Sequence, residues 1–443
     1  MLAYVVWLWS KRWSFLAFLL CGLPVLASAA PTASTAATLL AAFDTVLQRV
    51  VTLRQLAPTG PIARAVRDRQ QIRTSVTDSL SEEMSSEEWE AERQAMVHWG
   101  LIAADFRLQA FVVDLLTEQA AGYYDPKQRQ FFIADWLPKE IQEPVMAHEV
   151  VHALQDQHYD LQANFDLVKD HSDLTLTRRA LVEGDALAVM LMYMLEPLGL
   201  RIDQVPDMPT LLQAGASLLG EQFAVYTEAP LILRQQLVFP YVHGLEFVKV
   251  ALTQGSWARL KQVYQRPPVS TEQILHPEKY FAATPDLPSD VTLQGTGEQL
   301  HGTWSKVKRD VLGEFLLSVV LQQFLPEEEA KQSAAGWRGD RYELWQHPDS
   351  RQALLVCVTS WDTPEDAKEF FDSYTKLLAL KYPHWAKTAL DDQTGYIWQH
   401  EALRLLLRRQ EQMVHLVEGA QAIDLPRLQT LLEQVTAVPH PVP

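Results

Sequence analysis

Two histidines four positions apart, with a glutamate directly after the first, constrain this chain more than any other feature. They are His148, Glu149 and His152 in the stretch VMAHEVVHALQDQHYD, residues 145–160. The stretch has the apolar spacing of a helix, on which residues i and i+4 lie on one face. His148 and His152 can therefore bind one tetrahedral metal ion, with Glu149 at the flank of the same face.

This spacing is the H-E-x-x-H pattern, in which two histidines bind zinc and the glutamate takes a proton from the water that attacks a carbonyl. Neutral imidazoles leave the zinc its Lewis acidity, and the pKa of the bound water falls to about 7. The pattern also arises by chance in some chains with 13 histidines, so a third ligand has to support it. We predict a Zn²⁺ site with Glu149 as general base.

Glu183, in ALVEGDA, is the first candidate for the third ligand that a catalytic zinc needs. It falls in a helix predicted over residues 174–195 that is apolar around most of its circumference, where a carboxylate is costly unless it meets a cation. Gly184 beside it would let two helices approach closely at the metal. The alternative role for Glu183 is an ion pair with Arg178 or Arg179.

His158 is the second candidate for the third ligand. With His148 and His152 it gives H-E-x-x-H-x-x-Q-x-x-H, the spacing of the metzincins except that Gln155 stands at their glycine. That glycine turns the chain with a positive φ, a conformation that glutamine adopts poorly. We therefore place Glu183 at the metal and expect His158 to make structural hydrogen bonds, with the ligand role as its alternative.

This arrangement resembles the gluzincins, the thermolysin-like class in which a glutamate on the next helix completes H-E-x-x-H. The likeness covers residues 120–200. Thirty residues separate His152 from Glu183, more than in thermolysin, and the partner behind the ligands stays open between Asp156 and Asp185.

A second resemblance covers more of the chain. GYYDP, HEVVHALQDQHYDL, ALVEGDA, PPVSTEQILHPEKY and AAGWRGDRY are together similar to a poorly characterised family of predicted secreted bacterial metallopeptidases. This resemblance implies a zincin class of enzyme and names no substrate. An oxyanion donor, usually a tyrosine or a histidine, should also exist; we select His276, with His243 and Tyr280 as the other candidates.

The predicted fold class is α+β and predominantly helical. A zincin-like core over residues 120–330 would combine two metal-binding helices, the first with Pro144 in its first turn, with the hairpin GYYDPKQRQFFI. This hairpin falls where gluzincins place the edge strand that holds an extended peptide. A helical N-terminal region, residues 30–119, precedes the core, and a small α+β domain, residues 331–443, follows it.

Residues 1–29 have the order of a secretory signal peptide. Lys11 and Arg12 precede an apolar run and an Ala-x-Ala cleavage site near Ala29. The run is too short to span a bilayer, although the uncleaved segment could still anchor the chain to a membrane. We expect a protein exported to the periplasm or the extracellular space, without a membrane span after cleavage.

The charge of the chain excludes one class of partner. Acidic residues outnumber lysine and arginine by 55 to 38, for a net charge of −17, and nucleic acids require a basic surface. We therefore predict an exported zinc-dependent peptidase with peptide or protein substrates. The alternative is a non-catalytic zinc-binding factor of the cell envelope on a zincin scaffold, against which Glu149 argues, because a structural zinc site needs no general base.

Overall fold

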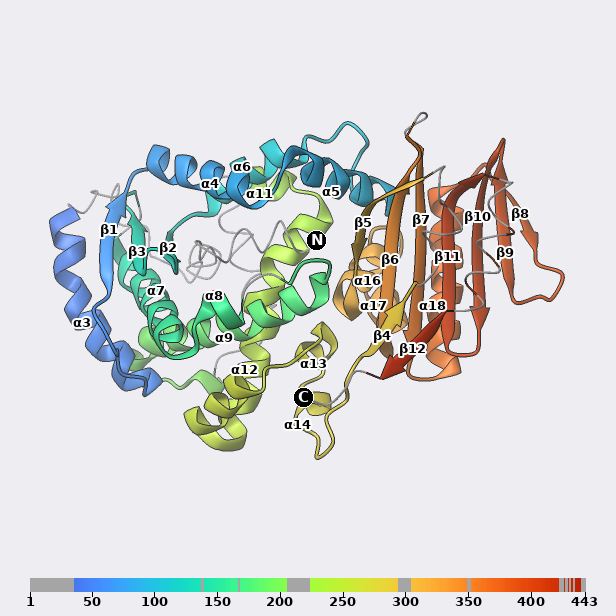
Figure 1. Cartoon of the computed structure of the whole chain (residues 1–443). Coiled ribbons are helices and arrows are strands. Elements are labelled where there is room, and N and C mark those ends of the chain that lie inside the picture. Colours follow the sequence, from blue (N-terminus) through green and yellow to red (C-terminus); the bar gives the residue numbers. More distant parts are fainter. Residues whose placement is uncertain are drawn as a thin grey trace.

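The chain folds as predicted into an α+β structure that is predominantly helical. The computed structural model describes residues 36–136, 139–165, 168–204, 224–293, 304–348, 352–421, 426, 429, 432 and 435–439. The expected signal peptide, residues 1–29, lies outside these ranges. Within them, every helix is too short or too polar to cross a membrane. A helical half and a sheet half lie side by side (Figure 1).

The helical half begins with the N-terminal region. Its elements are α3 (Ala36–Arg54), β1 (Ala63–Arg67), α4 (Arg69–Glu83), α5 (Ser86–His98) and α6 (Leu108–Gln119). It continues with β2 (Gly122–Asp125), β3 (Gln130–Ala134), α7 (Lys139–Tyr159), α8 (Leu161–Asn164), α9 (Ser172–Leu195), the short 3₁₀ turns η1 (Glu196–Leu198) and η2 (Ile202–Gln204), α11 (Ala224–Glu228), α12 (Leu231–Gln265), α13 (Thr271–Leu275) and α14 (Pro277–Phe281).

Helix α7 begins earlier than its sequence suggested. It starts at Lys139, so Pro144 lies inside the helix and not in its first turn. A proline there removes only the backbone hydrogen bond to the carbonyl of Glu140, which lies in the first turn. The helix can therefore extend past it without a break.

The predicted hairpin forms the edge of a three-stranded sheet with the order β1-β3-β2. Strands β2 and β3 are antiparallel, with Tyr123 opposite Phe132. The carboxylate of Asp125 accepts from the backbone N–H groups of Lys127 and Gln128 at 3.0 and 3.2 Å, which fixes the turn. The parallel partner β1 was not predicted, because it comes from a segment 67 residues before β3 in the chain, with Ala63 opposite Gln130.

Helices α9 and α12 contact each other backbone to backbone. A Cβ atom on Gly184 would lie 2.2 Å from the carbonyl carbon of Gly244, and one on Gly244 would lie 2.0 Å from the oxygen of Ala180. Nearly all of α9 is buried, as its apolar sequence predicted. The close approach expected at Gly184 is therefore made by α12.

The sheet half is built on seven antiparallel strands in the order β5-β6-β7-β11-β10-β9-β8. These are β5 (Ser305–Asp310), β6 (Trp337–Gln346), β7 (Ala353–Trp361), β8 (Ala386–Ala389), β9 (Gly395–His400), β10 (Leu403–Gln410) and β11 (Met413–Gln421), joined by α16 (Gly313–Gln322), α17 (Glu327–Ala334) and α18 (Pro364–Lys381). A small pair, β4 (Ser289–Thr292) with β12 (Thr436–Pro439), lies beside them. Because β5 pairs with β6, this sheet begins before residue 331, where we expected the C-terminal domain to start.

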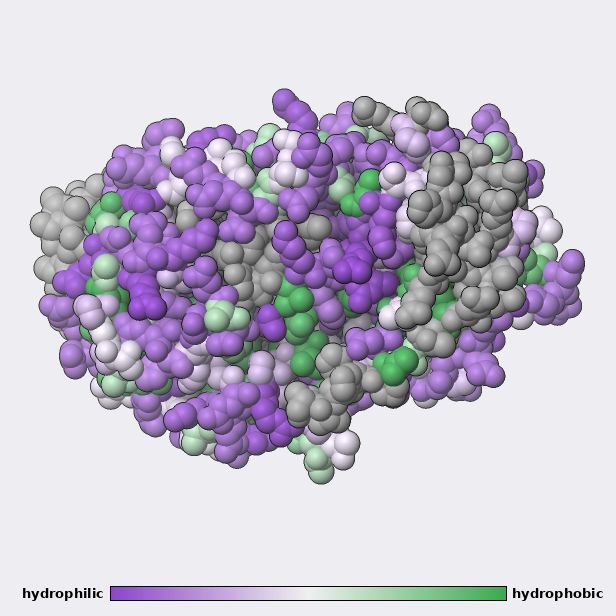
Figure 2. Space-filling model, in the orientation of Figure 1, coloured by the Kyte–Doolittle hydropathy of each residue, from purple (hydrophilic) through white to green (hydrophobic). Residues whose placement is uncertain are grey.

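Buried polar contacts join the two halves. Lys308 on β5 forms an ion pair of 2.5 Å with Glu92 on α5, and both side chains are fully buried. At the start of α9, Asp310 accepts from the backbone N–H of Ser172 at 2.7 Å. Next to it, the backbone N–H of Asp173 donates to the backbone oxygen of Val311, which follows β5, at 3.2 Å. On the face shown in Figure 2, most of the described residues at the surface are hydrophilic.

Substituting Gly244 by alanine should separate α9 from α12. The new methyl group would meet the backbone at Ala180, which cannot move aside as a flexible side chain would. We expect Gly244→Ala to lower the free energy of unfolding by about 1–3 kcal/mol, measured by urea denaturation. Gly60→Ala is the control, because no atom lies within 4 Å of the added methyl group; an equal loss in both variants would contradict the predicted clash.

Asp173 should make stability depend on pH. Burial, with Asp340 and Glu314 nearby, raises its pKa to about 8, whereas an unfolded aspartate titrates near pH 4. Between these values the folded chain keeps a proton that the unfolded chain has released, so the free energy of unfolding falls as pH rises from about 4 to about 8.

The variant Asp173→Asn should reduce this decline, as measured by urea denaturation at several pH values between 5 and 8. Asp105 is exposed, so Asp105→Asn serves as the matched control and should keep the slope of the wild type. The same slope in the wild type and in Asp173→Asn would show that Asp173 is not the group responsible.

Candidate functional site

Three side chains from two helices meet in the interior of the helical half. His148 and His152 come from α7 and Glu183 comes from α9, and each is at most 5% exposed. The Nε2 atoms of the two histidines lie 3.0 Å apart, and Oε2 of Glu183 lies 3.2 Å from His148 and 3.4 Å from His152. We call these three residues the His–His–Glu trio.

The geometry of the trio fits a zinc ion. Four ligands at bond lengths of about 2.0–2.1 Å stand roughly 3.3–3.4 Å from one another, which is the edge of a tetrahedron. The three separations in the trio are 3.0, 3.2 and 3.4 Å. Neutral imidazole nitrogens and one carboxylate are also the donor set that zinc accepts in catalytic sites.

The buried carboxylate of Glu183 is ionised beside the two histidines. Burial lowers the pKa of the His148 imidazole. Burial also opposes the charge of His152, but the Glu183 carboxylate outweighs this effect and raises the pKa of His152 to about 9. Burial likewise opposes the ionisation of Glu183, yet the two histidines hold its pKa well below the usual range. The ionised carboxylate is thus balanced by a proton on His152 or by a metal ion.

Gln155 lies behind His152 and orients its ring. The ring Nδ1 donates to Oε1 of Gln155 at 2.8 Å, which turns Nε2 toward the other two ligands. The amide nitrogen of Gln155 donates to Oδ2 of Asp185 and to the backbone oxygen of Val182, each at 3.0 Å. The residue that stands at the position of the metzincin glycine therefore supports His152, a candidate metal ligand.

Asp185 connects Gln155 to the N-terminal region. Arg54, the last residue of α3, donates to both carboxylate oxygens of Asp185 at 2.7 and 3.1 Å. Tyr264 of α12 donates to Oδ2 at 2.9 Å. Burial, together with Asp185, raises the pKa of Tyr264, so its hydroxyl keeps the proton that it donates. Asp156 and Asp185 were the two carboxylates proposed behind the ligands. Asp185 is linked to His152 through the side chain of Gln155. Asp156 instead accepts from the hydroxyl of Tyr124.

Glu149 is fully buried and lies beside β2, an edge strand. A Cβ atom on Gly122 of β2 would lie 3.4 Å from Cγ of Glu149 and 3.1 Å from Cγ1 of Val145. Because Gly122 has no side chain, the edge strand comes close to α7 where the carboxylate of Glu149 begins.

The remaining predicted site residues lie elsewhere. His158 is exposed at the end of α7 and donates from Nε2 to the backbone oxygen of Ala57 at 2.7 Å, a structural hydrogen bond of the kind we expected. His276 lies between α13 and α14 and contacts Glu314 at 2.8 Å. In the part of the chain that the structure describes, no recorded contact joins His276 to the trio, so its role as oxyanion donor stays a prediction.

Two further residues of the site were not selected from the sequence for a role of their own. Arg179 is 2% exposed, and its Nη2 lies 3.6 Å from Oε1 of Glu183. Glu183 therefore faces both the histidines and one of the two arginines that were its alternative partners. Tyr241 on α12 places its ring centroid 6.2 Å from that of His148. No local sequence signal marks Tyr241, because its position follows from the contact between α9 and α12.

Another group of carboxylates is already filled by the chain itself. Glu272, Asp286 and Asp362 surround the Nζ atom of Lys279 at 2.6, 3.2 and 2.8 Å. A lysine ammonium in this position supplies the positive charge that a metal ion would otherwise bring. We therefore assign this cluster a structural role.

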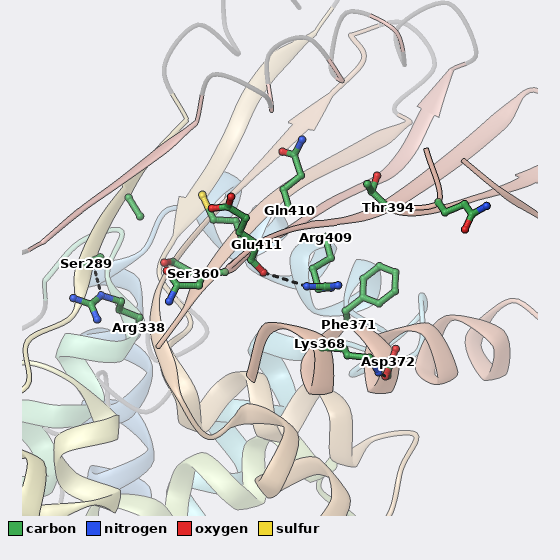
Figure 3. Close-up of a pocket in the computed structure, with 14 residues that line it drawn as sticks. Ser289, Arg338, Ser360, Lys368, Phe371, Asp372, Thr394, Arg409, Gln410 and Glu411 are labelled. Atoms are coloured by element: carbon green, nitrogen blue, oxygen red, sulfur yellow. Dashed lines mark hydrogen bonds and ion pairs between the residues drawn. The ribbon is translucent and has the colours of Figure 1, made fainter. Parts of the chain in front are cut away.

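A hollow in the sheet half is lined by polar residues from β7, α18, β10 and the turn before β11 (Figure 3). Its cations are engaged locally. Lys368 pairs with Asp372 at 2.5 Å, Arg338 donates to Ser289 at 3.1 Å, and Arg409 donates to the backbone oxygen of Glu411 at 3.4 Å. Because these cations already have partners in the chain, we place the candidate site at the His–His–Glu trio and not in this hollow.

Metal content should separate the ligands from their neighbours. We expect Glu183→Ala to lose stoichiometric zinc, because two histidines alone leave the site short of a ligand. Gln155→Leu should weaken zinc binding by about 10–100-fold, the usual effect of losing the partner behind a metal-bound histidine. The measurements are elemental analysis and a competition titration with a chelator.

His158→Ala and Gln157→Leu are the matched controls on the same helix, and both should keep the zinc affinity of the wild type. Gln157 bonds the backbone of Thr59 and has no recorded contact with the trio among the described residues. Zinc retained in Glu183→Ala but lost in His158→Ala would show that His158, and not Glu183, is the third ligand.

The comparisons with known proteins concern the sheet half. A family model described as "Domain of unknown function (DUF8575)" matches residues 299–429, the segment that contains β5 through β11. No curated protein and no solved structure matches the chain. The matched segment contains neither α7 nor α9, so a role for the trio has to be inferred from its geometry.

Proposed function

We propose that this chain is an exported zinc-dependent peptidase of gluzincin type. The observation that carries the proposal is the His–His–Glu trio, with Glu149 buried one residue from His148. Ligand atoms at tetrahedral spacing next to a carboxylate that is not itself a ligand are the parts that hydrolysis by an activated water needs.

His148, His152 and Glu183 would hold the zinc. A zinc ion bound there lowers the pKa of a water molecule to about 7 and polarises the carbonyl of the scissile bond. Glu149 takes one proton from the attacking water and delivers it to the nitrogen of the leaving amine. Water thus adds across the peptide bond, giving a new carboxylate and a new amine.

Strand β2 would position the substrate. Among the described strands it is one of the two edges of its sheet, and all four of its residues are buried, so an extended peptide would pair with its backbone only after the parts that cover it move aside. A Cβ atom added at Gly122 of this strand would be in van der Waals contact with the side chain of Glu149. A peptide added along β2 would therefore carry its scissile bond past the general base.

Export rests on the sequence of residues 1–29 alone. Two basic residues, an apolar run and an Ala-x-Ala site form the secretory pattern. An excess of acidic residues, 55 against 38 basic ones, is compatible with a soluble protein outside the cytoplasm.

Glu149→Gln should abolish peptide hydrolysis while leaving zinc bound. The amide cannot accept the proton of the attacking water, so we expect kcat to fall by at least about 100-fold. The assay is cleavage of a broad peptide library, read by mass spectrometry, with zinc measured in the same samples.

Glu143→Gln is the matched control, since Glu143 is on the same helix and accepts from Tyr193 at 2.6 Å; it should leave cleavage within a few-fold of the wild type. Stoichiometric zinc in a wild-type protein that cleaves no peptide of the library would favour the alternative, a non-catalytic zinc-binding factor of the cell envelope. Cleavage that persists in Glu149→Gln would show that Glu149 is not the general base.

A further inference from the structure

Arg179 is a buried cation with donors that the chain does not use. Its guanidinium is 2% exposed, and neither Nε nor Nη1 has a hydrogen-bond partner among the described residues. The remaining nitrogen, Nη2, lies 3.6 Å from Oε1 of Glu183, which is an ion-pair contact and too long for a good hydrogen bond. Arg179 therefore keeps most of its five N–H groups available.

The charge of Arg179 is also incompletely balanced. Its nearest carboxylate, Glu183, turns its other oxygen toward the two histidines and is shared with the cation that the trio holds. Tyr241 lies close enough to act on the charge of Arg179, but a phenol supplies no negative charge at neutral pH. An arginine buried in this way is strongly unfavourable unless an anion joins it.

We propose that Arg179 binds a carboxylate of the substrate. The planar guanidinium presents parallel N–H groups that match the two oxygens of a carboxylate, a pairing that lysine cannot reproduce. This inference rests on the proposed peptidase function and specifies the substrate class: peptides with a negative charge close to the scissile bond.

The position of Arg179 limits how far that charge lies from the bond that is cut. Arg179 and Glu183 are one helical turn apart on the same face of α9. One residue of an extended peptide spans about 3.3–3.6 Å. A substrate whose carboxylate reaches Arg179 would therefore place a peptide bond one or two residues away next to the trio.

Two sources could supply this carboxylate. One is the free C-terminus of the peptide, which would make the enzyme remove one or two residues from the end of a chain. The other is the side chain of an aspartate or a glutamate beside the scissile bond. The chemistry at Arg179 is the same in both, and matched pairs of peptides distinguish them.

The experiment compares peptides that differ only in one charge. One pair carries a free C-terminal carboxylate or a C-terminal amide, and the other pair carries an internal glutamate or glutamine at the same position. For wild-type protein we expect kcat/KM to favour the charged member of one pair by about 100-fold. In Arg179→Met this ratio should fall to within about threefold of one, with zinc retained.

Arg179→Lys and Arg178→Met complete the set. Lysine keeps the charge without the planar fork, so we expect it to restore part of the preference, about tenfold. Arg178 lines a different hollow, with Asp156 and His158, and Arg178→Met should keep the full preference. A wild-type protein without a charge preference, or an Arg179→Met variant that slows both members equally or loses zinc, would overturn the proposal.

Binding separates this proposal from the peptidase function. In the Glu149→Gln background, calorimetry with the preferred charged peptide and its neutral partner should show an affinity difference that Arg179→Met removes. If that difference is found but wild-type protein cleaves no peptide, the peptidase function fails and the anion site stands. If peptides are cleaved and neither rate nor affinity depends on Arg179, the anion site fails and the peptidase function stands.

Discussion

The ion pair between Arg54 and Asp185 is the contact on which the His–His–Glu trio depends. Its two hydrogen bonds of 2.7 and 3.1 Å are buried, and Asp185 in turn holds the amide of Gln155. Gln155 orients the ring of His152. The position of His152, a proposed metal ligand, thus depends on an arginine that is far away in the sequence, through two intermediate side chains. Removing one partner of such a pair leaves a buried charge and typically costs about 3–5 kcal/mol.

This dependence bears on the N-terminal region. A helical region that precedes a catalytic core can serve as a propeptide, which is released on activation. Arg54 ends α3, within that region, and supplies the counter-charge to Asp185. A cut that released α3 would leave Asp185 buried without this cation. The N-terminal region therefore belongs to the half of the molecule that carries the trio.

Local patterns in the sequence were sufficient to predict that His148, His152 and Glu183 meet, but not the contacts that hold them in place. The spacing of His148 and His152, and the burial of Glu183 in an apolar helix, predicted the three residues that meet. Gln155 was interpreted only as a missing glycine, because its role depends on Asp185, thirty residues away in the chain. Strands β1 and β5 were missed or misplaced for a similar reason, since each is defined by a partner that is distant in the sequence.

The long separations within the site have a consequence for folding. Arg54 and Asp185 are 131 residues apart, and Gln155 and Tyr264 are 109 residues apart. Contacts between such distant segments form slowly, because the chain between them must first lose its conformational freedom. The support of the trio by α3 and α12 is therefore expected to form late in folding. A metal ion bound at the trio would then meet a nearly finished protein and stabilise it, instead of acting as the nucleus from which it folds.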